Sequence, residues 1–539
     1  MLLLTATTRA ATWAVELAPD VDPYEFGAQH QLRLVDSFAP SFHIYEGDLE
    51  RNRAARDAAV KWAEEQVPQR RYPKRPVVAR LEDDPLYGDQ WHLQGGEHGV
   101  GPIPAGATGR GIIISIVDDG LQHTHPELSA NYDARYSGNY NGGPHGAGDP
   151  APNTAGPDSD AHGTAAAGVA VGVAHNGHCG MGVAPEARVA GVRLIAGPAT
   201  DLQEAQALTR HSEAVHIYSS SWGPEDSAHG IEGPGRLVRE ALAHNGKGRV
   251  YVWAAGNGRA LGDSCAFDGY AGNPYVNAIG ATDYAGNQAF YSEGCSNLLA
   301  VAPSSGASAR GIITADLMGA AGYDATECTR SFGGTSSAAP LAAGLFALML
   351  QARPSLGWRD VRHVVASASR YSAHASVANA AGYKHSNEIG FGLLKASALL
   401  ALAANHTLVP QPQRQCVFAT AAAGSIVPGI PFTITPAACN VSFIENAIVR
   451  LALHCPRASG GRGSVRITLR APSGTQSVLA EPRPGDAANE DYPGEGWGFS
   501  SLAFWGESPR GDWLLRVQGC GGASEGARMG HIVFAVFGY

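Results

Sequence analysis

One octapeptide constrains the fold of this chain more than any other segment. Residues 333–340 read Gly-Gly-Thr-Ser-Ser-Ala-Ala-Pro and run directly into the apolar stretch 341–350. Small residues crowd both sides of Ser336, and Gly334 permits a turn that a larger residue would disfavour. Pro340 suits the beginning of a helix, where backbone amides lack internal partners. The pattern predicts a buried helix with Ser336 held rigidly at its start, either as a nucleophile or as a simple helix cap.

Length and composition predict a globular protein of several domains. The 539 residues exceed what one core usually supports, so two or three domains are expected. With 44% apolar and 16% charged residues, the chain should be folded rather than disordered. No apolar stretch reaches the roughly 20 residues that a membrane-spanning helix needs, so 341–350 is expected to be a core helix. The net charge of −10 argues against a nucleic-acid partner and would suit a basic ligand.

Cysteine usage and two glycosylation motifs favour an oxidising compartment. The eight cysteines include no CxxC pair, which disfavours a zinc or redox site. Asn405 and Asn440 each begin an Asn-X-Ser/Thr motif, and cytosolic free thiols are the alternative. The start of the chain conflicts with secretion, because Met-Leu-Leu-Leu is far shorter than the roughly 7–15 apolar residues of a secretory signal. Either the N-terminus is incomplete or the secretory interpretation is wrong, since no signal peptide or transmembrane segment is visible.

The texture of the sequence changes twice and suggests three domains, at residues 1–80, 81–405 and 406–539. In the first, residues 12–17 alternate as a strand does, and residues 48–66 have a helical composition. A basic, proline-rich cluster at 70–75 then has the character of an exposed protease target. These features predict a small α+β domain that can be cut away.

The two later domains differ in strand pattern. Continuous apolar strands are expected at 111–117, 187–194 and 249–254, with helical runs between them, which predicts a parallel sheet covered on both faces. Such a sheet places its functional site at the carboxyl ends of its strands. Beyond residue 406, Gly and Pro are frequent, and short strands such as 447–453, 465–469 and 513–517 predict an antiparallel sandwich.

Three polar residues in glycine-rich segments can meet at that sheet edge. Asp118 follows the strand 111–117, His162 heads a helix of small residues, and Ser336 opens the apolar helix. Serine is a poor nucleophile until a neutral imidazole accepts its proton, and a carboxylate fixes the imidazole tautomer and stabilises its cation. Each residue alone has a plain structural role. Together, in the order Asp, His, Ser on a parallel α/β pattern, they predict a serine hydrolase site.

These motifs, with Trp-Ala-Ala-Gly-Asn-Gly at 253–258, resemble those of subtilases. Segments 218–226 and 263–270 narrow the resemblance to the furin/kexin proprotein convertases, and it covers nearly the whole chain. The resemblance implies a subtilisin-like α/β domain between an α+β pro-domain and an all-β P domain. It also implies a calcium-dependent serine endopeptidase that cleaves precursor proteins after Arg at paired or multibasic sites. Its own pro-domain would inhibit the enzyme until self-processing removes it.

The resemblance assigns roles to individual residues. Ser336 is expected to be the nucleophile, His162 the general base and Asp118 the orienting acid. Asn257 is expected in the oxyanion hole, where a side-chain donor lowers the barrier by roughly 3–4 kcal/mol. The residues expected to bind the basic substrate are Asp226 and Asp268 for the arginine before the cut, Asp119 for the residue preceding it, Glu204, Glu232 and Tyr270 for an arginine further upstream, and Ser221, Trp222 and Gly223. The segment 159–161 departs from the family pattern, so preference at the penultimate position is expected to be looser.

Calcium and two disulfides are further implications of the resemblance. The expected calcium ligands are Asp226, Asp263 and Glu293 behind the primary pocket, and Asp84, Glu127 and Asn176 at a second site; oxygen-only ligands suit this ion. Cys265 is expected to pair with Cys295, and Cys179 with Cys328. The pairing of Cys416, Cys439, Cys455 and Cys520 stays open, because four cysteines allow three connectivities.

The processing site and the competing functions also stay open. Arg75 is the junction by position, but Pro76 follows it, so Arg71 is a plausible replacement and processing is expected somewhere in 71–80. A degradative subtilase of broad specificity is the alternative enzyme, which Asp226 and Asp268 argue against. An inactive binding protein that uses the P domain is the alternative outside enzymes, which the intact triad argues against. We expect a monomer in the lumen of the secretory pathway, such as the Golgi.

Overall fold

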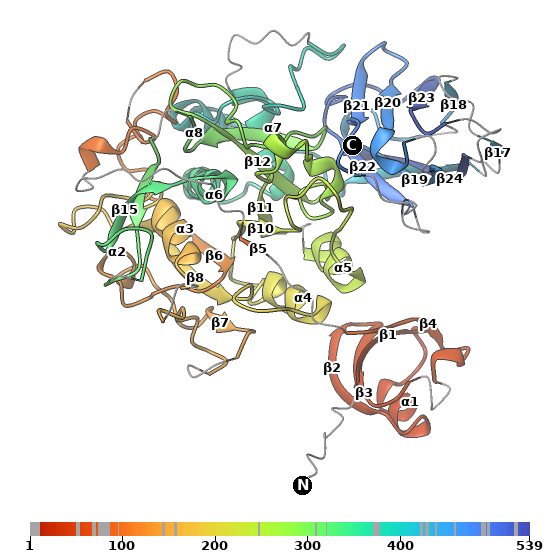
Figure 1. Ribbon diagram of the computed structural model, residues 1–539, viewed down its shortest axis with the longest axis horizontal. Helices are drawn as coiled ribbons and strands as arrows, with labels where there is room; N and C mark the ends of the chain where they lie inside the picture. The colour runs from red at the N-terminus through yellow and green to blue at the C-terminus, as the bar shows by residue number, and fades with distance from the viewer. Residues whose placement is uncertain are drawn as a thin grey trace.

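A computed structural model describes residues 11–49, 54–66, 72–73, 87–94, 96–142, 146–155, 159–245, 248–307, 310–319, 321–369, 378–420, 424–425, 431–436, 439–456, 460–486, 492, 496–521 and 527–539. Figure 1 shows an N-terminal sheet with a helix, a central α/β body and a C-terminal pair of sheets. Three residues singled out in the sequence, Arg71, Arg75 and Asp84, lie outside the described ranges.

The N-terminal unit is an antiparallel sheet with the strand order β2-β3-β1-β4 and one helix. Its elements are β1 (Thr12–Leu17), α1 (Pro23–Gln29), β2 (Arg33–Ala39), β3 (Phe42–Glu46) and β4 (Val60–Glu65). The strand expected at 12–17 is confirmed as β1. The helix expected at 48–66 is wrong in its described part, where a 3₁₀ turn at Ala54–Arg56 is followed by β4. Pairing of β4 along β1 overrides the local helical composition.

The central body is built on a parallel sheet with the strand order β13-β12-β11-β9-β6-β8-β7. The strands are β6 (Ile113–Asp118), β7 (Gly138–Asn139), β8 (Arg188–Arg193), β9 (Ile217–Ser220), β11 (Val250–Ala254), β12 (Val276–Thr282) and β13 (Leu298–Pro303). The strands expected at 111–117, 187–194 and 249–254 are therefore confirmed, as β6, β8 and β11. Beside the sheet, β14 (Ile312–Ala315) pairs with β15 (Cys328–Phe332), and β10 (Trp222–Gly223) pairs with β5 (Tyr72–Pro73).

Helices cover both faces of this sheet. They are α2 (Pro126–Ser129), α3 (His162–Val171), α4 (Asp201–Thr209), α5 (Arg236–Asn245), α6 (Thr335–Ala352), α7 (Trp358–Ala368) and α8 (Ala396–Asn405). Neighbouring residues of one strand serve opposite layers, because side chains alternate along a strand. Ile116 packs in the layer of α3, α6, α7 and α8, whereas Val117 packs in the layer of α4 and α5.

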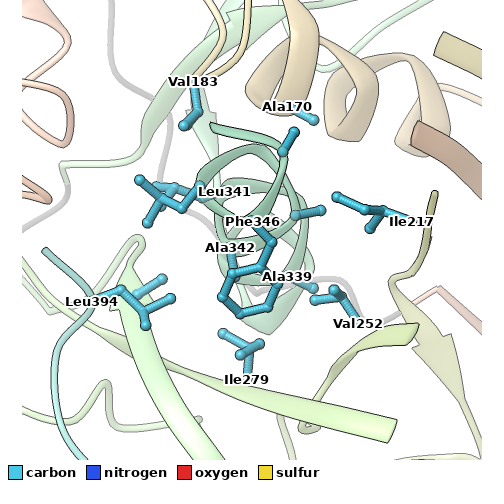
Figure 2. Packing of buried hydrophobic residues seen from close by; sticks show 14 of the residues in the cluster. Ala170, Val183, Ile217, Val252, Ile279, Ala339, Leu341, Ala342, Phe346 and Leu394 are labelled. Atoms are coloured by element: carbon cyan, nitrogen blue, oxygen red, sulfur yellow. The ribbon is translucent and has the colours of Figure 1, made fainter. Parts of the chain in front are cut away.

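Helix α6 runs through the centre of the larger layer. By length and composition alone it could span a membrane, but 89% of its residues are buried, which identifies it as the expected core helix. Figure 2 shows its side chains enclosed by residues of α3, β9, β11 and β12; the labelled residues are Ala170, Val183, Ile217, Val252, Ile279, Ala339, Leu341, Ala342, Phe346 and Leu394.

One detail of α6 differs from the sequence expectation. The helix starts at Thr335, so Pro340 lies in its second turn rather than at its beginning. Proline has no N–H to donate to the carbonyl four residues earlier, which is that of Ser336. Ser221 Oγ donates to this carbonyl oxygen instead, at 3.1 Å. Because of Pro340, the carbonyl oxygen of Ser336 is available to accept a hydrogen bond from Ser221, in the loop after β9.

The N-terminal unit packs on the layer of α4 and α5. Phe42 and Ile44 of β3 belong to the same buried cluster as Leu237 and Val238 of α5. The guanidinium of Arg236 lies 4.7 Å from the ring centre of Trp62 and also pairs with Glu16. Figure 1 shows this unit beside α4. An apolar sheet face and one partly buried cation, Arg236, thus join the N-terminal unit to the central body.

The C-terminal unit is a sandwich of two antiparallel sheets, as the sequence predicts. One sheet has the order β16-β24-β19-β22 with β17 at β24, and the other has the order β18-β23-β20-β21. The strands are β16 (Arg414–Thr420), β17 (Gly424–Ser425), β18 (Phe432–Ile434), β19 (Ile444–His454), β20 (Arg466–Arg470), β21 (Gln476–Ala480), β22 (Trp497–Ser501), β23 (Trp513–Gln518) and β24 (Arg528–Gly538).

The cysteines form disulfides in pairs. Cys179 pairs with Cys328, and Cys265 with Cys295, as the resemblance implied. The structure resolves the open pairing of the sandwich as Cys416 with Cys439 and Cys455 with Cys520.

A buried ionic network joins the sandwich to the central body. Arg359 of α7 donates to both carboxylate oxygens of Glu445 in β19, at 2.7 Å each. His363 lies 2.8 Å from Glu445, and Gln413 donates to it at 2.9 Å. Burial alone would raise the pKa of Glu445, but the hydrogen bonds and charges of His363 and Arg359 outweigh burial and lower the pKa to about 2. Glu445 is therefore an ionised anchor between the two units.

Replacing Glu445 by Gln should destabilise the folded protein by about 3–5 kcal/mol at pH 7, because the buried Arg359 loses its counter-charge. The folded pKa is depressed, so this contribution is present above the ordinary pKa of about 4.3 and is lost as the pH falls toward 2. Denaturant unfolding of both proteins between pH 3 and pH 7 measures the difference. Glu481→Gln, at an exposed pair with Arg466, is the control and should change stability by less than about 1 kcal/mol. Equal losses in the two variants would contradict the prediction.

Candidate active site

A carboxylate and an imidazole meet at the carboxyl edge of the central sheet. Asp118 is the last residue of β6, and His162 is the first of α3, and both side chains are almost fully buried. His162 donates from Nδ1 to Asp118 Oδ1 at 2.8 Å. This bond fixes the tautomer and leaves Nε2 as the basic nitrogen. Among the described residues, Nε2 has no hydrogen-bond partner, so it can accept a proton from an incoming group.

Asp119 holds the beginning of the helix that carries His162. Its carboxylate accepts the backbone N–H of His162 at 3.1 Å and of Gly163 at 2.8 Å, two amides that a helix start leaves without internal partners. Glycine is required at position 163, because a Cβ there would lie 2.1 Å from the carbonyl oxygen of Gly120. Burial, and then the neighbouring charge of Asp118, raises the pKa of Asp119 to about 7.

Ser336 lies at the start of α6, directly after a strained turn. Gly334 has φ 71°, a left-handed conformation that favours glycine, and it precedes the first helical residue. Ser336 Oγ lies 3.4 Å from the carbonyl oxygen of Ser221, which follows β9. Strands β6 and β9 are neighbours in the sheet, and α3 packs against α6. Ser336 therefore belongs to the same edge of the sheet as Asp118 and His162.

Asn257, in the loop after β11, is held with its amide nitrogen available. Its Oδ1 accepts both the backbone N–H of Thr335 at 2.8 Å and the Thr335 hydroxyl at 3.0 Å. With the oxygen fixed in this way, Nδ2 is the donor that remains. It is buried and makes no hydrogen bond within the part of the chain that the structure describes. The arrangement is one that can donate to a developing oxyanion beside Ser336.

An acid-lined cavity of about 120 Å³ lies behind this edge. Its lining includes Asp226, Glu232, Asp263, Asp268 and Glu293, which are five of the residues selected from the sequence. A Cβ at Gly258 would lie 2.7–3.2 Å from atoms of Asp263, Glu293 and Asp226, so these three side chains converge around that glycine.

Backbone amides stabilise the carboxylates of this cavity. Asp226 accepts from the N–H of Asn257 at 3.0 Å, and Glu293 from that of Gly258 at 2.9 Å. Asp268 accepts from the N–H of Tyr270 at 2.7 Å. The carboxylate oxygens that line the cavity are thus supported by amide donors, and an acidic lining of this kind suits a cationic ligand.

The residues expected to bind an upstream arginine are also close together. The Tyr270 hydroxyl donates to Glu204, and both side chains are fully buried. The Tyr270 ring stacks on Trp253, with ring centres 5.2 Å apart. Glu232 forms an isolated parallel bridge with Asp268, which places it on the wall of the cavity.

The expected substrate-binding segment, Ser221, Trp222 and Gly223, already has a partner strand. Residues 72–73 form β5 and pair antiparallel with β10, with Pro73 opposite Trp222 and Tyr72 opposite Gly223. Residues 72–73, which precede the central body in the sequence, thus add a second strand to β10 beside Ser221. Backbone pairing of this kind is how an extended peptide binds to an exposed strand.

A second cavity, of about 270 Å³, is lined by Tyr87 and residues 174–181. Asn176 is in its lining and donates from Nδ2 to Glu127 at 3.0 Å. Burial raises the pKa of Glu127 to about 8, because the hydrogen bonds from Asn176 and Gly180 compensate for only part of its desolvation. A buried carboxyl group beside an amide side chain offers oxygen donors of the kind that a hard cation such as calcium takes.

The three-carboxylate cluster around Gly258 also fits calcium by its oxygen-only donors. Within the described ranges, however, no group of three or more His, Cys, Asp or Glu side chains is arranged so that it could hold a metal ion. The fit at both places therefore rests on the oxygen chemistry of the donors.

Sequence reasoning missed three contributors to the site. Thr335 orients Asn257 by donating to its Oδ1. The only sequence signal for this role is that Thr335 directly precedes the expected nucleophile, Ser336. Asp160 forms an ion pair with Arg193 at 2.8 Å. The sequence shows that segment 159–161 differs from the family pattern, but it does not show this partner. Arg483 of the sandwich contacts Asp263 at 3.0 Å, and nothing in its sequence context signals this.

Comparison with solved structures supports the fold. A serine protease of Aeromonas sobria, solved in complex with a chaperone, matches with a TM-score of 0.72 at 22% identity, covering 85% of this chain and 95% of that one. Fervidolysin of Fervidobacterium pennivorans matches with a TM-score of 0.58 at 16% identity, covering 97% and 78%. These likenesses confirm the expected subtilisin-like architecture.

Sequence comparisons identify the family. The model of the subtilase family matches residues 109–392, and that of the proprotein convertase P-domain matches residues 444–530. Furin of Homo sapiens is 36% identical, covering 98% of this chain and 68% of its own length. Proprotein convertase subtilisin/kexin type 4 of Homo sapiens is 38% identical, covering 86% and 61%. The chain belongs to the subtilase family of serine proteases and, within it, to the furin/kexin-type proprotein convertases.

Proposed function

We propose that this protein is a calcium-dependent serine endopeptidase that cleaves precursor proteins after Arg at paired or multibasic sites. The observation that supports it most is the buried Asp118–His162 hydrogen bond at the same sheet edge as an acid-lined cavity. We propose the division into a pro-domain (1–80), a catalytic domain (81–405) and a P domain (406–539).

In the proposed reaction, Ser336 Oγ attacks the scissile carbonyl carbon while His162 Nε2 accepts the hydroxyl proton. Asp118 holds the imidazole and stabilises its cation. The negative charge on the carbonyl oxygen is stabilised by Asn257 Nδ2–H, and His162 then protonates the departing amine. Water releases the acyl group by the same steps in reverse order. The fixed tautomer of His162 and the fixed amide of Asn257 support these roles, because neither group needs to reorganise during the reaction.

The proposed specificity depends on charge. Asp226 and Asp268 would bind the guanidinium of the arginine before the cut, with charge-assisted hydrogen bonds. Glu204, Glu232 and Tyr270 would bind a basic residue further upstream. A degradative enzyme of broad specificity remains the alternative, and the acidic lining of the cavity disfavours it.

The penultimate position would be less selective. Asp119, the proposed contact there, also accepts two backbone amides, and Asp160 pairs with Arg193. Both carboxylates therefore already have partners that compete with a substrate lysine or arginine. This supports the looser preference expected from the segment 159–161.

The enzyme is proposed to be made as a zymogen. The N-terminal unit packs on α4 and α5, and residues 72–73 extend β10 beside Ser221, whose carbonyl oxygen lies 3.4 Å from Ser336 Oγ. This arrangement supports inhibition by the unit itself and cleavage somewhere in 71–80. Arg71 and Arg75 are the candidate sites.

Calcium would be held by Asp226, Asp263 and Glu293 behind the primary cavity, and by Glu127 and Asn176 at the second cavity. Bound calcium would neutralise carboxylates and fix the loops that carry them. Asp84 stays a proposed ligand of the second site.

The setting is proposed to be the lumen of the secretory pathway, with the protein acting as a monomer on precursor proteins. The disulfides support an oxidising compartment. Asn405 and Asn440 are exposed, as glycosylated residues must be.

Cleavage profiling tests the proposed function. The unmodified protein should cut a peptide library after Arg, with a second basic residue enriched upstream, and its mature N-terminus should lie within 72–81. Ser336→Ala should abolish both peptide hydrolysis and self-processing while leaving a folded full-length chain. Cleavage after apolar residues as often as after Arg would favour the degradative alternative. If the Ser336→Ala variant is as active as its parent, Ser336 is not the nucleophile.

Calcium binding should stabilise the protein. In the inactive Ser336→Ala background, calcium in excess over a chelator should raise the thermal midpoint by at least about 5 °C, since a ligand at 100 times its Kd contributes about 2.7 kcal/mol. Glu127→Gln should remove part of this shift. Glu186→Gln, at an exposed pair with Arg110, is the matched control and should retain all of it. A midpoint that calcium leaves unchanged would eliminate both metal sites.

Asp119 should give the stability a characteristic pH dependence. Its folded pKa of about 7 exceeds the ordinary value of about 3.9, so the folded protein binds this proton more tightly and stability falls as the pH rises from 4 to 7. In the Ser336→Ala background, Asp119→Asn removes this contribution. The midpoint of the Asn variant relative to its parent should therefore rise across that window. A difference between variant and parent that stays constant with pH would show that folding does not raise the pKa of Asp119.

A further inference from the structure

The C-terminal sandwich contacts both walls of the acid-lined primary cavity. One wall is the loop 226–232 and the other is the segment 263–268. His229 of the first wall lies with Nδ1 2.6 Å from the carbonyl oxygen of Gly485. Trp497 of β22 donates from Nε1 to the carbonyl of Ala266 in the second wall, at 2.8 Å. The cavity thus belongs to the central body, but its walls are supported from another unit.

Arg483 is the most direct of these contacts. It is 2% exposed, and its Nη1 donates to Asp263 Oδ1 at 3.0 Å. Its guanidinium carbon lies 3.7 Å from the ring centre of Phe267, which also lines the cavity. A planar cation that both pairs with a carboxylate and stacks on a ring has a defined orientation, because the two contacts constrain different directions.

The guanidinium is anchored from behind within the sandwich. Nη2 of Arg483 donates to Asp486 at 2.6 Å, and Arg462 donates to the same carboxylate at 2.8 and 2.9 Å. Arg462 also donates to the carbonyl oxygen of His229, at 3.0 Å. Two arginines and one aspartate therefore form a rigid buried group, with one arginine directed at each wall of the cavity.

Asp263 transmits this anchoring to the first wall. Its other oxygen, Oδ2, accepts the backbone N–H of Ala228 at 2.7 Å. Ala228 has φ 60°, a left-handed conformation that is unfavourable for alanine and persists only where its surroundings hold it. Two residues earlier in the same loop is Asp226, a proposed contact of the substrate arginine. The position of Asp226 thus depends on a strained turn that Asp263 restrains.

We propose that Arg483 is a positioning residue for the primary specificity pocket: through Asp263 it holds the Ala228 turn, and with it Asp226, in the geometry that binds the substrate arginine. The C-terminal sandwich is then a structural part of the pocket. This inference rests on the proposed function in one respect, that Asp226 and Asp268 bind the side chain before the cut. A carboxylate has enough lone pairs for Asp263 to serve Arg483 and a calcium ion together, so the two roles are compatible.

The test compares Arg483→Met with its parent, in the full chain with calcium in excess and with active sites counted by titration. Peptides that differ only in Arg or Lys before the cut report on the pocket. The Met variant should raise KM for the Arg peptide at least about tenfold, with kcat within about twofold, because the contact affects substrate binding rather than chemistry. Its preference for Arg over Lys should shrink. Arg483→Lys keeps the positive charge but loses the planar set of N–H donors, so its KM and its preference for Arg over Lys should lie between those of the parent and the Met variant.

Arg466→Met is the matched control, because Arg466 is in β20 of the same sandwich and pairs with Glu481 at the surface. It should leave KM and selectivity within about twofold of the parent. If Arg483→Met, with its active sites counted by titration, has the same KM and the same selectivity as the parent, the proposal is overturned, even if the melting temperature of the variant is lower. Where Arg483→Met yields no folded enzyme, a KM more than about twofold above the parent in Arg483→Lys supports it, and an unchanged KM overturns it. A parent without preference for basic residues would instead refute the proposed function.

Discussion

The burial of one apolar helix through the middle of the molecule is the constraint on which the rest of the structure depends. Helix α6 contacts the sheet on one side and α3 on the other, so its first residues emerge at the edge where the parallel strands end. The left-handed Gly334 turns the chain into this helix, and Pro340 leaves the carbonyl of Ser336 for Ser221. A rigid core thereby fixes the position of one hydroxyl, and a mobile loop could not do so.

Around that hydroxyl the fold has to accommodate many buried carboxylates. It does so in two ways. Asp226, Asp268 and Glu293 accept backbone amides from tight turns, whereas Glu445 and Asp263 pair with buried arginines from another unit. The first solution keeps charge facing the cavity, where a basic ligand can use it. The second joins separate domains, because leaving one partner buried alone would be costly.

Much of the fold and of the site could be predicted from the sequence, for identifiable reasons. The strands at 12–17, 111–117, 187–194 and 249–254 are found because continuous or alternating apolar runs are local signals. Asp118, His162, Ser336 and Asn257 were selected because glycine-rich motifs surround them, and the structure places them at one sheet edge. The segment 48–66 was predicted wrongly, since β4 owes its conformation to pairing with β1 rather than to composition. Ser336 opens α6 as expected, but Pro340 lies in the second turn of the helix because the helix already begins at Thr335.

The sequence by itself determined the parallel α/β class, the sandwich that follows it, and the chemical types at the site, because periodicity and motif spacing are written in neighbouring residues. Only the tertiary structure decided which carboxylates receive amides and which receive arginines. It also decided the cysteine pairing in the sandwich, the packing of the N-terminal unit on α4 and α5, and the contact of Arg483 with Asp263. Most of these contacts join residues tens to hundreds of positions apart, and no local pattern records which distant partner a buried charge will find.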